Sequence, residues 1–447
     1  MRLGILASHP IQYQAPGFRA LAKVVDLEVF FAHRQSAAEQ GKAGFGVAFE
    51  WDVDLLSGYR HRFLKNVSSK PGVDHFFGCD TPEIAEIIRA RGPQDHGLRT
   101  TDQVTPCGQK SEVSGQWPIV SRPVFDAFIV TGWHLKSYWQ AVRACRRTGV
   151  PVLVRGDSQL LTPCSLLKRW AKELVYRVLL RQFDGFLTVG QRNREYLAHY
   201  GVPPEKIFFA PHFVDNEWFR GKAEIAQKQR AEIRQALEIP EDAFCVLFCG
   251  KFIPKKRPLD LVEAARLLMV DGGLPKVHLL FVGSGELGRR LRDSCHVVFD
   301  AENANYQLST INHQLPPASF AGFKNQSELP RYYAAADVLV LPSESETWGL
   351  VVNEAMGCGL PAIVSEAVGC VPDLIENGKT GFTFPVADVK VLATRLLEIG
   401  RLRREGRDFT NALYRKMAAY SVETAVAGTC DAAKSFSDRS LRTGKQG

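Results

Sequence analysis

The sequence predicts an α/β protein made of two domains, each built on a parallel sheet. Its 447 residues exceed the roughly 250–300 residues at which a single hydrophobic core stops growing. Short apolar segments alternate with amphipathic ones along the chain, which is typical of strands joined by helical crossovers. The alternation restarts after a polar stretch near the middle. We therefore predict a first domain over 1–216, a linker over 217–240 and a second domain over 241–421.

The first domain is expected to contain six buried strands, because six of its segments are short and almost entirely apolar. These segments are Leu3–Ala7, Leu27–Ala32, Ala127–Thr131, Val152–Arg155, Phe186–Val189 and Ile207–Ala210. Amphipathic stretches at Phe18–Lys23 and Tyr138–Arg147 predict helices between them. The stretch 93–121, which is rich in Gly, Thr, Gln and Ser, predicts a long loop.

The predicted linker contains a polar, helix-prone stretch, Ala223–Leu237, that ends at Ile239-Pro240. After it come the predicted strands and the helix of the second domain. They are Phe244–Gly250, a helix over Leu259–Met269, His278–Val282, Val338–Leu341, Pro361–Val364 and Gly381–Phe384. A second long loop is predicted over 301–319. A last helix over 422–434 is expected to cross back to the first domain, and the polar tail 435–447 is expected to be disordered.

Composition is that of a soluble globular protein, with 45% hydrophobic and 23% charged residues. The first apolar run is too short for a signal peptide, and no segment reaches the roughly 18 apolar residues of a membrane span, so we expect a cytoplasmic protein. The ten cysteines show no Cys-x-x-Cys pair, which favours reduced packing residues over a zinc or disulfide framework. A formal charge of +8 is compatible with nucleic acid, anionic lipid or phosphorylated substrates, and does not distinguish them.

The most informative segment runs from Pro342 to Pro361. It leaves an apolar strand, passes Gly349 and enters a short helix, and such a junction directs backbone N–H groups and the positive end of the helix dipole at an anion. Two carboxylates, Glu346 and Glu354, flank this phosphate site. Because acids repel phosphate, their natural partners are sugar hydroxyls, which donate to carboxylates. An isolated pair of glutamates on a solvated helix is the alternative.

Glu346 and Glu354, with seven residues between them, lie in a string that resembles the Glu-x7-Glu signature of the family 4 retaining glycosyltransferases of GT-B fold. The string is Pro-Ser-x-x-Glu, Gly-Leu, Glu-Ala-Met and Gly-Leu-Pro. The resemblance implies two Rossmann-like domains facing each other across a cleft. It also implies that Glu346 contacts the donor sugar, that Glu354 contacts the ribose, and that the backbone around Trp348, Gly349 and Leu350 meets the sugar and diphosphate.

A second segment, Cys249 to Pro258, resembles the family loop Gly-Arg-x-x-x-x-Lys. Gly250 begins this loop and Lys256 matches the family lysine, whereas Lys251 stands where the family has arginine. Fixed cations here would stabilise the negative charge that grows on a leaving diphosphate. A solvated basic turn is the alternative.

The run Gly283-Ser284-Gly285-Glu286-Leu287-Gly288 admits two interpretations. With Asp300 at the end of the next apolar run it has the pattern of a dinucleotide-binding fingerprint. The resembled family has the same Val-Gly-x-Gly turn facing the donor, which places Gly283 and Gly285 at the donor. We favour the second interpretation, because the turn follows the second strand of its domain and not the first.

The segment Phe320 to Lys324 resembles the family loop that meets the nucleotide base. Phe323 and Lys324 would frame the base by stacking and hydrogen bonding. An ordinary core phenylalanine is an equally good interpretation of Phe323.

The first half supplies candidate acceptor contacts after two of its strands, where α/β sheets bind ligands. His9, Gln12 and Tyr13 follow the first strand, in place of the Gly-rich loop of the family. Arg155 and Asp157 follow a later strand, and Asp157 falls where many relatives carry a histidine near the sugar. Asp157 is the candidate contact to the donor sugar and Arg155 the candidate contact to an acidic acceptor.

The stretch Leu166 to Arg177 has apolar residues at helical spacing beside a basic face. We interpret it as a helix that packs its apolar stripe on the sheet. A peripheral contact with anionic membrane is the alternative.

Taken with the resemblance, these residues predict a retaining glycosyltransferase that uses a UDP- or GDP-sugar as co-substrate and has no resident cofactor. The expected acceptor is a glycan, a lipid-linked precursor or a small molecule, in polysaccharide or envelope biosynthesis, and no nucleic-acid partner is expected. Lys251, Lys256 and backbone N–H groups would replace a metal ion at the diphosphate. An NAD(P)-dependent oxidoreductase using Gly283 to Gly288 and a non-catalytic nucleotide-sugar-binding protein are the rival predictions.

Overall fold

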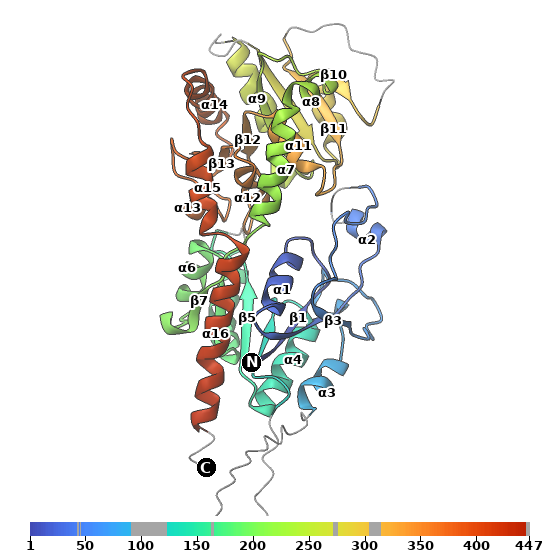
Figure 1. The fold of residues 1–447 in the computed structure, drawn as a ribbon, viewed down its shortest axis with the longest axis vertical. Helices are drawn as coiled ribbons and strands as arrows, with labels where there is room; N and C mark the ends of the chain where they lie inside the picture. Colours follow the sequence, from blue (N-terminus) through green and yellow to red (C-terminus); the bar gives the residue numbers. More distant parts are fainter. Residues whose placement is uncertain are drawn as a thin grey trace, which may run out of the picture.

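The computed structural model describes residues 1–90 except 43 and 45, then 123–161, 165–270, 276–303 and 314–443. It contains two seven-stranded sheets, one in each half of the chain. Figure 1 shows the two domains stacked along the long axis, with the first domain below and the second above. The α/β class and the two Rossmann-like domains predicted from the sequence are confirmed.

The first sheet is parallel throughout and has the order β3-β2-β1-β4-β5-β6-β7. Its strands are β1 (Arg2–Ala7), β2 (Asp26–Phe31), β3 (Arg60–Phe63), β4 (Ala127–Val130), β5 (Val152–Gly156), β6 (Gly185–Thr188) and β7 (Ile207–Phe209). Most are continuously apolar because helices cover both faces of the sheet. The sequence prediction missed β3, because this edge strand reads Arg-His-Arg-Phe and exposes its charged side chains.

Helices cover the two faces of the first sheet unequally. One face carries α3 (Glu83–Arg89), α4 (Lys136–Thr148), α5 (Leu166–Leu179) and α6 (Gln191–His199), and the other carries α1 (Ala15–Ala22) and part of α16 (Val422–Thr443). Helix α2 (Ala37–Lys42) and three short 3-10 turns, Phe76–Gly78, Leu180–Gln182 and Pro204–Lys206, complete the domain. The predicted loop 93–121 lies outside the described residues.

The second sheet is also parallel, with the order β10-β11-β9-β8-β12-β13-β14. Its strands are β8 (Phe244–Cys249), β9 (Val277–Val282), β10 (His296–Asp300), β11 (Pro317–Gly322), β12 (Val338–Leu341), β13 (Ala362–Ser365) and β14 (Gly381–Phe384). The predicted loop 301–319 is corrected at its end, where β11 begins at Pro317. Strand β11 reads Pro-Ala-Ser-Phe-Ala-Gly, and it lacks the β-branched side chains that indicate a strand.

Two helices of the predicted linker belong to the core of the second domain. Helices α7 (Asn216–Lys228) and α8 (Arg230–Ala236) bury Phe219 and Ile233 against it. The same face carries α11 (Leu329–Ala335), α12 (Leu350–Gly357), α13 (Val371–Leu374) and α15 (Thr410–Ala418). The opposite face carries α9 (Pro258–Val270), α10 (Gly288–Asp293) and α14 (Val389–Arg404), and Pro254–Lys256 forms a 3-10 turn.

Helix α16 descends from the second domain along the first in Figure 1. Its residues Ala432 and Ala433 are fully buried, and Phe436 packs against Phe208 with ring centroids 5.9 Å apart. The prediction that the chain is disordered from residue 435 is therefore wrong up to Thr443. Helix α16 continues to that residue, and the packing of Phe436 holds it against the first domain. In the part of the chain that is described, no helix combines the length and apolarity needed to cross a membrane. All eight cysteines in that part are buried, as the packing interpretation predicts.

Strand order fixes where ligands can bind. In each sheet the order reverses beside the first strand, between β1 and β4 in one domain and between β8 and β12 in the other. Loops at the carboxyl ends of such strands diverge to opposite faces and leave a crevice. The loop after β1 contains Gln12 and Tyr13, the loop after β8 contains Lys251, and the loop after β12 contains Glu346. The tertiary fold thus brings these segments to one cleft.

Candidate active site

A cavity of about 550 Å³ lies between the two domains, at the carboxyl ends of both sheets. It brings together fourteen of the seventeen residues that the sequence indicated. They are Gln12, Tyr13, Asp157, Gly250, Lys251, Lys256, Gly283, Phe323, Lys324, Glu346, Trp348, Gly349, Leu350 and Glu354. His9, Arg155 and Gly285 do not line this cavity.

Gly349 sets the path of the loop between β12 and α12. Its φ of +101° lies in the region that favours glycine, and a Cβ there would come within 2.8 Å of Val368 Cγ1. The turn starts α12 at Leu350, and the side of the helix N-terminus with Leu350 and Val351 lines the cavity. The first backbone N–H groups of a helix have no partner within it, so this end can bind an anion.

The Glu354 carboxylate lies one turn further along α12. Tyr333 donates a hydrogen bond to its Oε2 over 2.6 Å. Burial raises the pKa of Glu354 to about 7, although the Tyr333 hydroxyl acts in the opposite direction. A carboxylate this poorly solvated gains from further hydroxyl donors, such as those of a sugar.

Glu346 forms an ion pair with Lys256 across the cavity wall. The Ser343 hydroxyl also donates to Glu346 Oε1, over 3.2 Å, and the Gln159 side chain of the first domain donates to the Glu346 backbone carbonyl. These contacts hold the carboxylate at the mouth of the second sheet. The sequence analysis named Lys256 and Glu346 as site residues from two separate loops. The structure brings both into one cavity and shows that they form an ion pair.

Two glycines let the cationic loop approach the glycine-rich turn. Gly250 has a φ of +146°, and a Cβ on Gly283 would come within 1.9 Å of the Gly250 carbonyl oxygen. Only glycine fits at such a distance. Lys251 follows Gly250 into the cavity, where burial and the neighbouring Lys256 lower its pKa. Two positive charges held this close favour a multiply charged anion between them.

The base-binding candidate Phe323 contacts the first domain. Its ring lies 4.6 Å from that of Phe49 at an interplanar angle of 40°, and Phe49 in turn meets Trp51 at 5.0 Å. Trp51 lines the cavity, which the sequence analysis did not indicate. Lys324 forms an ion pair with Glu328 over 3.4 Å.

Hydrogen bonds fasten the same segment of the first domain to the second. Asn325 Nδ2 donates to the Glu50 carbonyl over 2.6 Å, and the Ser327 backbone N–H lies 3.3 Å from both Asp52 carboxylate oxygens. We call residues 49–52 the latch. Trp51 of the latch lines the cavity together with Phe323.

His212 is a central residue that the sequence analysis missed. Its ring lies 6.0 Å from that of Tyr13 and 5.4 Å from that of Trp348, and its Nε2 lies 3.9 Å from Asp157 Oδ2. Burial lowers the pKa of His212, although the contact with Asp157 acts in the opposite direction. It follows β7, so the rule that ligands bind at the carboxyl ends of parallel strands would have indicated it.

Two buried polar atoms at this end of the cavity have no partner among the described residues. They are Gln12 Oε1 and His212 Nδ1. Because a buried polar atom without a hydrogen bond costs about 1–3 kcal/mol, such atoms indicate a missing ligand or water. Both residues line the cavity from the first domain.

Asp157 remains ionised in this environment. Burial opposes its ionisation, but the His212 ring and the hydroxyl of Thr347 outweigh burial and lower the pKa of Asp157 to about 2. Tyr13 behaves differently, since burial raises its pKa to about 12 and keeps the phenol protonated. The cavity therefore presents a fixed negative charge and a hydroxyl donor on its first-domain side.

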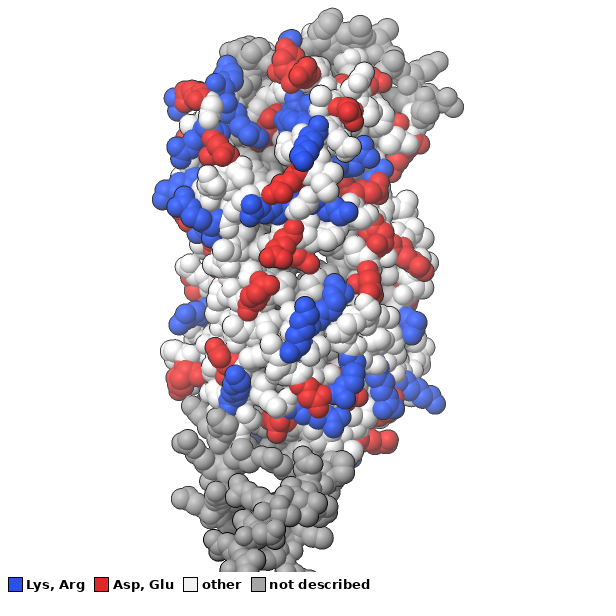
Figure 2. Space-filling view, in the orientation of Figure 1, with Lys and Arg blue, Asp and Glu red and all other residues white. Residues whose placement is uncertain are grey.

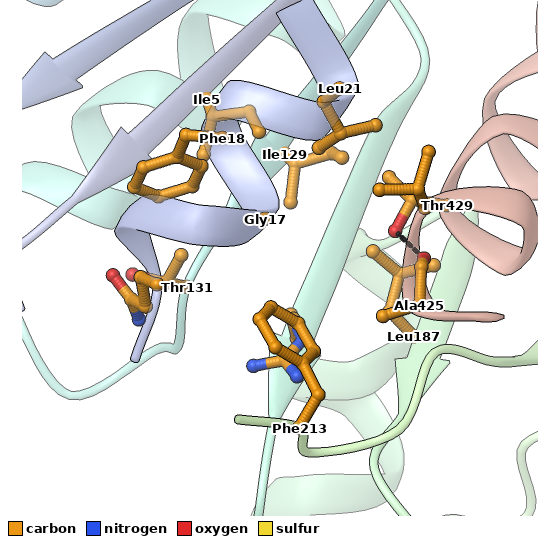
Figure 3. Close-up of a pocket in the computed structure, with 13 residues that line it drawn as sticks. Ile5, Gly17, Phe18, Leu21, Ile129, Thr131, Leu187, Phe213, Ala425 and Thr429 are labelled. Atoms are coloured by element: carbon orange, nitrogen blue, oxygen red, sulfur yellow. Dashed lines mark hydrogen bonds between the residues drawn. The ribbon is translucent and has the colours of Figure 1, made fainter. Parts of the chain in front are cut away.

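Arg155 lies at a second, much smaller cavity of about 50 Å³ between α1, the first sheet and α16 (Figure 3). Its Nη2 donates to the Pro211 carbonyl over 2.9 Å, and its guanidinium lies 6.0 Å from the Phe213 ring. Apolar side chains such as Ile5, Phe18 and Leu187 form most of this wall (Figure 3). Arg155 thus supports the loop that carries His212, and it does not line the larger cavity.

His9 and Gly285 also lie away from the larger cavity. His9 contacts Ser8 Oγ over 3.0 Å, and burial, aided by His33, lowers its pKa to about 4. A Cβ on Gly285 would come within 2.8 Å of the Phe252 backbone, so this glycine allows two loops to pack closely. Gly285 does not line the larger cavity.

The geometry of Asp300 argues against a dinucleotide site at Gly283 to Gly288. Arg292 binds Asp300 through two contacts, Nε to Oδ2 over 2.6 Å and Nη2 to Oδ1 over 3.0 Å. Strand β11 also separates β10, which ends at Asp300, from β9, which precedes the glycines. A dinucleotide site needs this acid free and next to the turn to bind the ribose.

Two family models match the chain in tandem. The "Glycosyl transferase 4-like domain" matches residues 49–212, and "Glycosyl transferases group 1" matches residues 229–416. A D-inositol 3-phosphate glycosyltransferase of Streptomyces bingchenggensis is 34% identical over 194 residues, which are 43% of this chain and 39% of that protein. The sulfoquinovosyl transferase SQD2 of Arabidopsis thaliana is 51% identical over 186 residues, 41% of this chain and 31% of that protein. The matched region spans less than half the length of these curated relatives.

Solved structures resemble the fold over nearly the whole chain. The Anabaena protein HepE in complex with UDP and glucose has a TM-score of 0.61 and 16% identity, over 97% of this chain and 100% of that one. Sucrose-phosphate synthase from Thermosynechococcus elongatus has a TM-score of 0.62 and 18% identity, over 97% and 98%. The fold is GT-B, with two Rossmann-like domains, and the two family models and the curated relatives above are glycosyltransferases. Within that class the chain belongs to the group 1 glycosyltransferases, of the family 4 type.

Proposed function

We propose that this enzyme transfers a sugar, with retention, from a UDP- or GDP-sugar to a hydroxyl of a glycan, a lipid-linked precursor or a small molecule. The observation that carries the proposal is the composition of one cavity, in which Lys251 and Lys256 lie with Glu346 and Glu354. Cations match a diphosphate and acids match the hydroxyls on either side of it.

The donor would lie along α12. Its diphosphate meets the N–H groups at the start of the helix and the two lysine ammonium groups, and Glu354 accepts hydrogen bonds from the ribose. Lys256, now paired with Glu346, would then share its charge with the phosphate. The released Glu346 carboxylate accepts from hydroxyls of the transferred sugar.

Transfer breaks the bond between the anomeric carbon and the diphosphate oxygen, and the electron pair leaves on that oxygen. The acceptor oxygen attacks from the same face, and its proton passes to the leaving phosphate oxygen. Lys251 and Lys256 favour this step because the charge they neutralise grows as the bond breaks. In this proposal the two ammonium groups perform the role that a metal ion has in other transferases.

The acceptor would approach from the first domain. Gln12, Tyr13 and His212 line that side, and two of them present unpartnered polar atoms. Asp157, held ionised, orients the donor sugar or the attacking hydroxyl. The proposal places the reaction in the cytoplasm, in polysaccharide or envelope biosynthesis.

A panel of UDP- and GDP-sugars incubated with the purified chain tests the proposal. Many transferases slowly hydrolyse their donor when no acceptor is present, so release of UDP or GDP from one donor is the expected result. The Lys256→Ala variant should lose that release while still binding the nucleotide. Binding of a donor without release of the nucleotide under any acceptor mixture would instead support the non-catalytic binding protein.

A further inference from the structure

Helix α5 exposes an apolar stripe on the side that faces away from the core of the first domain. Trp170, Leu174 and Val178, four residues apart, are 72%, 74% and 61% exposed. Tyr176 occupies the opposite side of the helix, with its ring 6.1 Å from Trp133 and 5.4 Å from Tyr200. The expectation that the apolar stripe of Leu166 to Arg177 packs on the sheet is therefore wrong for Trp170 and Leu174. The sheet is contacted through a different side of the helix.

The neighbouring helix α4 adds charge to this surface. Arg146 of α4 donates a hydrogen bond to the backbone carbonyl of Gln182, in the 3-10 turn that follows α5, so the C-terminal end of α5 lies near α4. Helix α4 contains four basic residues and no acid, and α5 contains four basic residues and one acid. The two helices thus carry a formal charge of +7, against +8 for the whole chain.

Several of these charges are available for an external partner. Arg143 and Arg147 of α4 are exposed, and neither makes an ion pair or hydrogen bond with any described residue. The face drawn in Figure 2 differs, because basic and acidic side chains are intermixed there over both domains.

We propose that α4 and α5 form a docking surface for a bilayer of anionic lipids. Trp170 and Leu174 would enter the interfacial layer, where an indole ring is especially favourable, and the arginines would meet lipid phosphates. A second copy of the chain fits this surface poorly, because facing copies would bring together two surfaces of the same charge. The helix lies on the surface and does not cross the membrane.

Docking through the first domain has a consequence for the reaction. If the proposed function holds, the acceptor side of the cleft belongs to the docked domain, so a lipid-linked acceptor would reach it from the same surface. Binding to the bilayer itself does not depend on the transfer activity. The two proposals can therefore fail separately.

Co-sedimentation of the full chain with vesicles tests the docking surface. We expect binding to phosphatidylcholine vesicles that contain 30% phosphatidylglycerol, weak binding to pure phosphatidylcholine, and loss of binding as salt is raised. The double variant Trp170→Ser/Leu174→Ser should bind at least tenfold more weakly. The double variant Arg143→Gln/Arg147→Gln should lose about fivefold per arginine on the anionic vesicles alone.

Matched substitutions on the second domain serve as controls. Ile225→Ser removes an apolar side chain that is 59% exposed on α7, and Arg289→Gln removes a charge that is 94% exposed on α10. Both should bind vesicles as the unchanged protein does, and every variant should keep its thermal unfolding temperature and its nucleotide release from the free donor. Equal binding by the docking variants would overturn the proposal. So would a dimer in light scattering that dissociates only in Trp170→Ser/Leu174→Ser.

Discussion

The Thr347 hydroxyl donates a hydrogen bond to Asp157 Oδ2 over 2.8 Å, and this bond crosses the cleft between the two domains. Thr347 lies in the loop after β12 and Asp157 follows β5. The bond ties the position of the donor loop to a charged group of the first domain.

Removing the Asp157 charge should affect turnover more than nucleotide binding. Asp157→Asn keeps the shape and one acceptor atom, so we expect turnover to fall at least tenfold while the Kd for UDP or GDP changes less than threefold. Thr347→Val tests the bond itself and should give a smaller loss of turnover. Isothermal calorimetry and a nucleotide-release assay measure the two quantities. An equal loss in Kd and turnover would contradict this assignment.

The lowered pKa of Asp157 predicts that the free energy of unfolding decreases as the pH falls into the acid range. The folded-state pKa of Asp157 is lowered to about 2 from an ordinary value of 3.8. Its contribution to stability is therefore present above about pH 4 and is lost as pH falls through about 2. Unfolding temperatures measured from pH 5 to pH 2.5 should fall less steeply in Asp157→Asn than in the unchanged protein. Parallel curves would show that Asp157 is not held ionised by its surroundings.

Glu354 should give the opposite dependence in the ligand-free enzyme. Burial raises its pKa from 4.5 to about 7, so its contribution to stability is full below pH 4.5 and is lost as pH rises through 7. The donor, by contrast, needs the carboxylate, so its affinity should rise over the same range. Glu354→Gln should flatten both curves. A donor affinity that is independent of pH between 5.5 and 8 would exclude the ionised carboxylate from donor binding.

Truncation of Glu354 should weaken donor binding strongly. If the carboxylate holds two ribose hydroxyls, Glu354→Ala costs about 2–3 kcal/mol, which is about 30- to 150-fold in Kd. A 2′-deoxyribonucleotide should lose affinity with the unchanged enzyme and little further affinity with the variant. Calorimetry with UDP and with 2′-deoxy-UDP, or with the guanine pair, measures this coupling.

Lys256 should act on the transition state. Lys256→Ala is expected to lower turnover about 10²–10³-fold, the range found when one group that stabilises a developing oxyanion is removed. Lys256→Arg keeps the charge and should recover part of the rate. The fold should be unaffected in both, as judged by thermal unfolding. Normal turnover in Lys256→Ala would remove the leaving-group role.

The latch should contribute to donor affinity from the first domain. Trp51→Ala removes a ring from the cavity wall and Asp52→Ala removes the acceptor of Ser327, so each should raise the KM for the donor several-fold. Glu50→Ala is the matched control, because the latch uses only the Glu50 backbone carbonyl. An unchanged KM in Trp51→Ala would show that the latch closes without contacting the nucleotide.

Local sequence was sufficient for much of this site. Glu346, Glu354, Gly349 and Lys256 could be predicted because the strand, the turn and the helix that hold them are contiguous in the chain. A strand can be predicted from the sequence when its residues are apolar. Strands β8 and β12 are apolar and were predicted, whereas the charged edge strand β3 was not. Strand β11 was missed for a related reason, since small residues carry no strand preference.

Contacts between distant segments could not be predicted in the same way. Trp51 belongs to no motif, and its segment is held at the cavity by the contact of Phe49 with Phe323 of the second domain. Arg155 was assigned to an acceptor from its place after β5, but the side chain turns to Pro211 and Phe213. Which way a side chain points after a strand depends on packing against other elements, and no local pattern encodes it.

The sequence by itself determined the two α/β domains, the family and the loop that carries the two glutamates, because each rests on residues close together in the chain. The tertiary structure alone decided that Lys256 pairs with Glu346, that Asp157 is bound from the opposite domain, and that Trp170 faces outward. Each of these depends on how two separately folded cores meet or where a helix rotates on its sheet. Those outcomes are set by the summed contacts of many distant side chains.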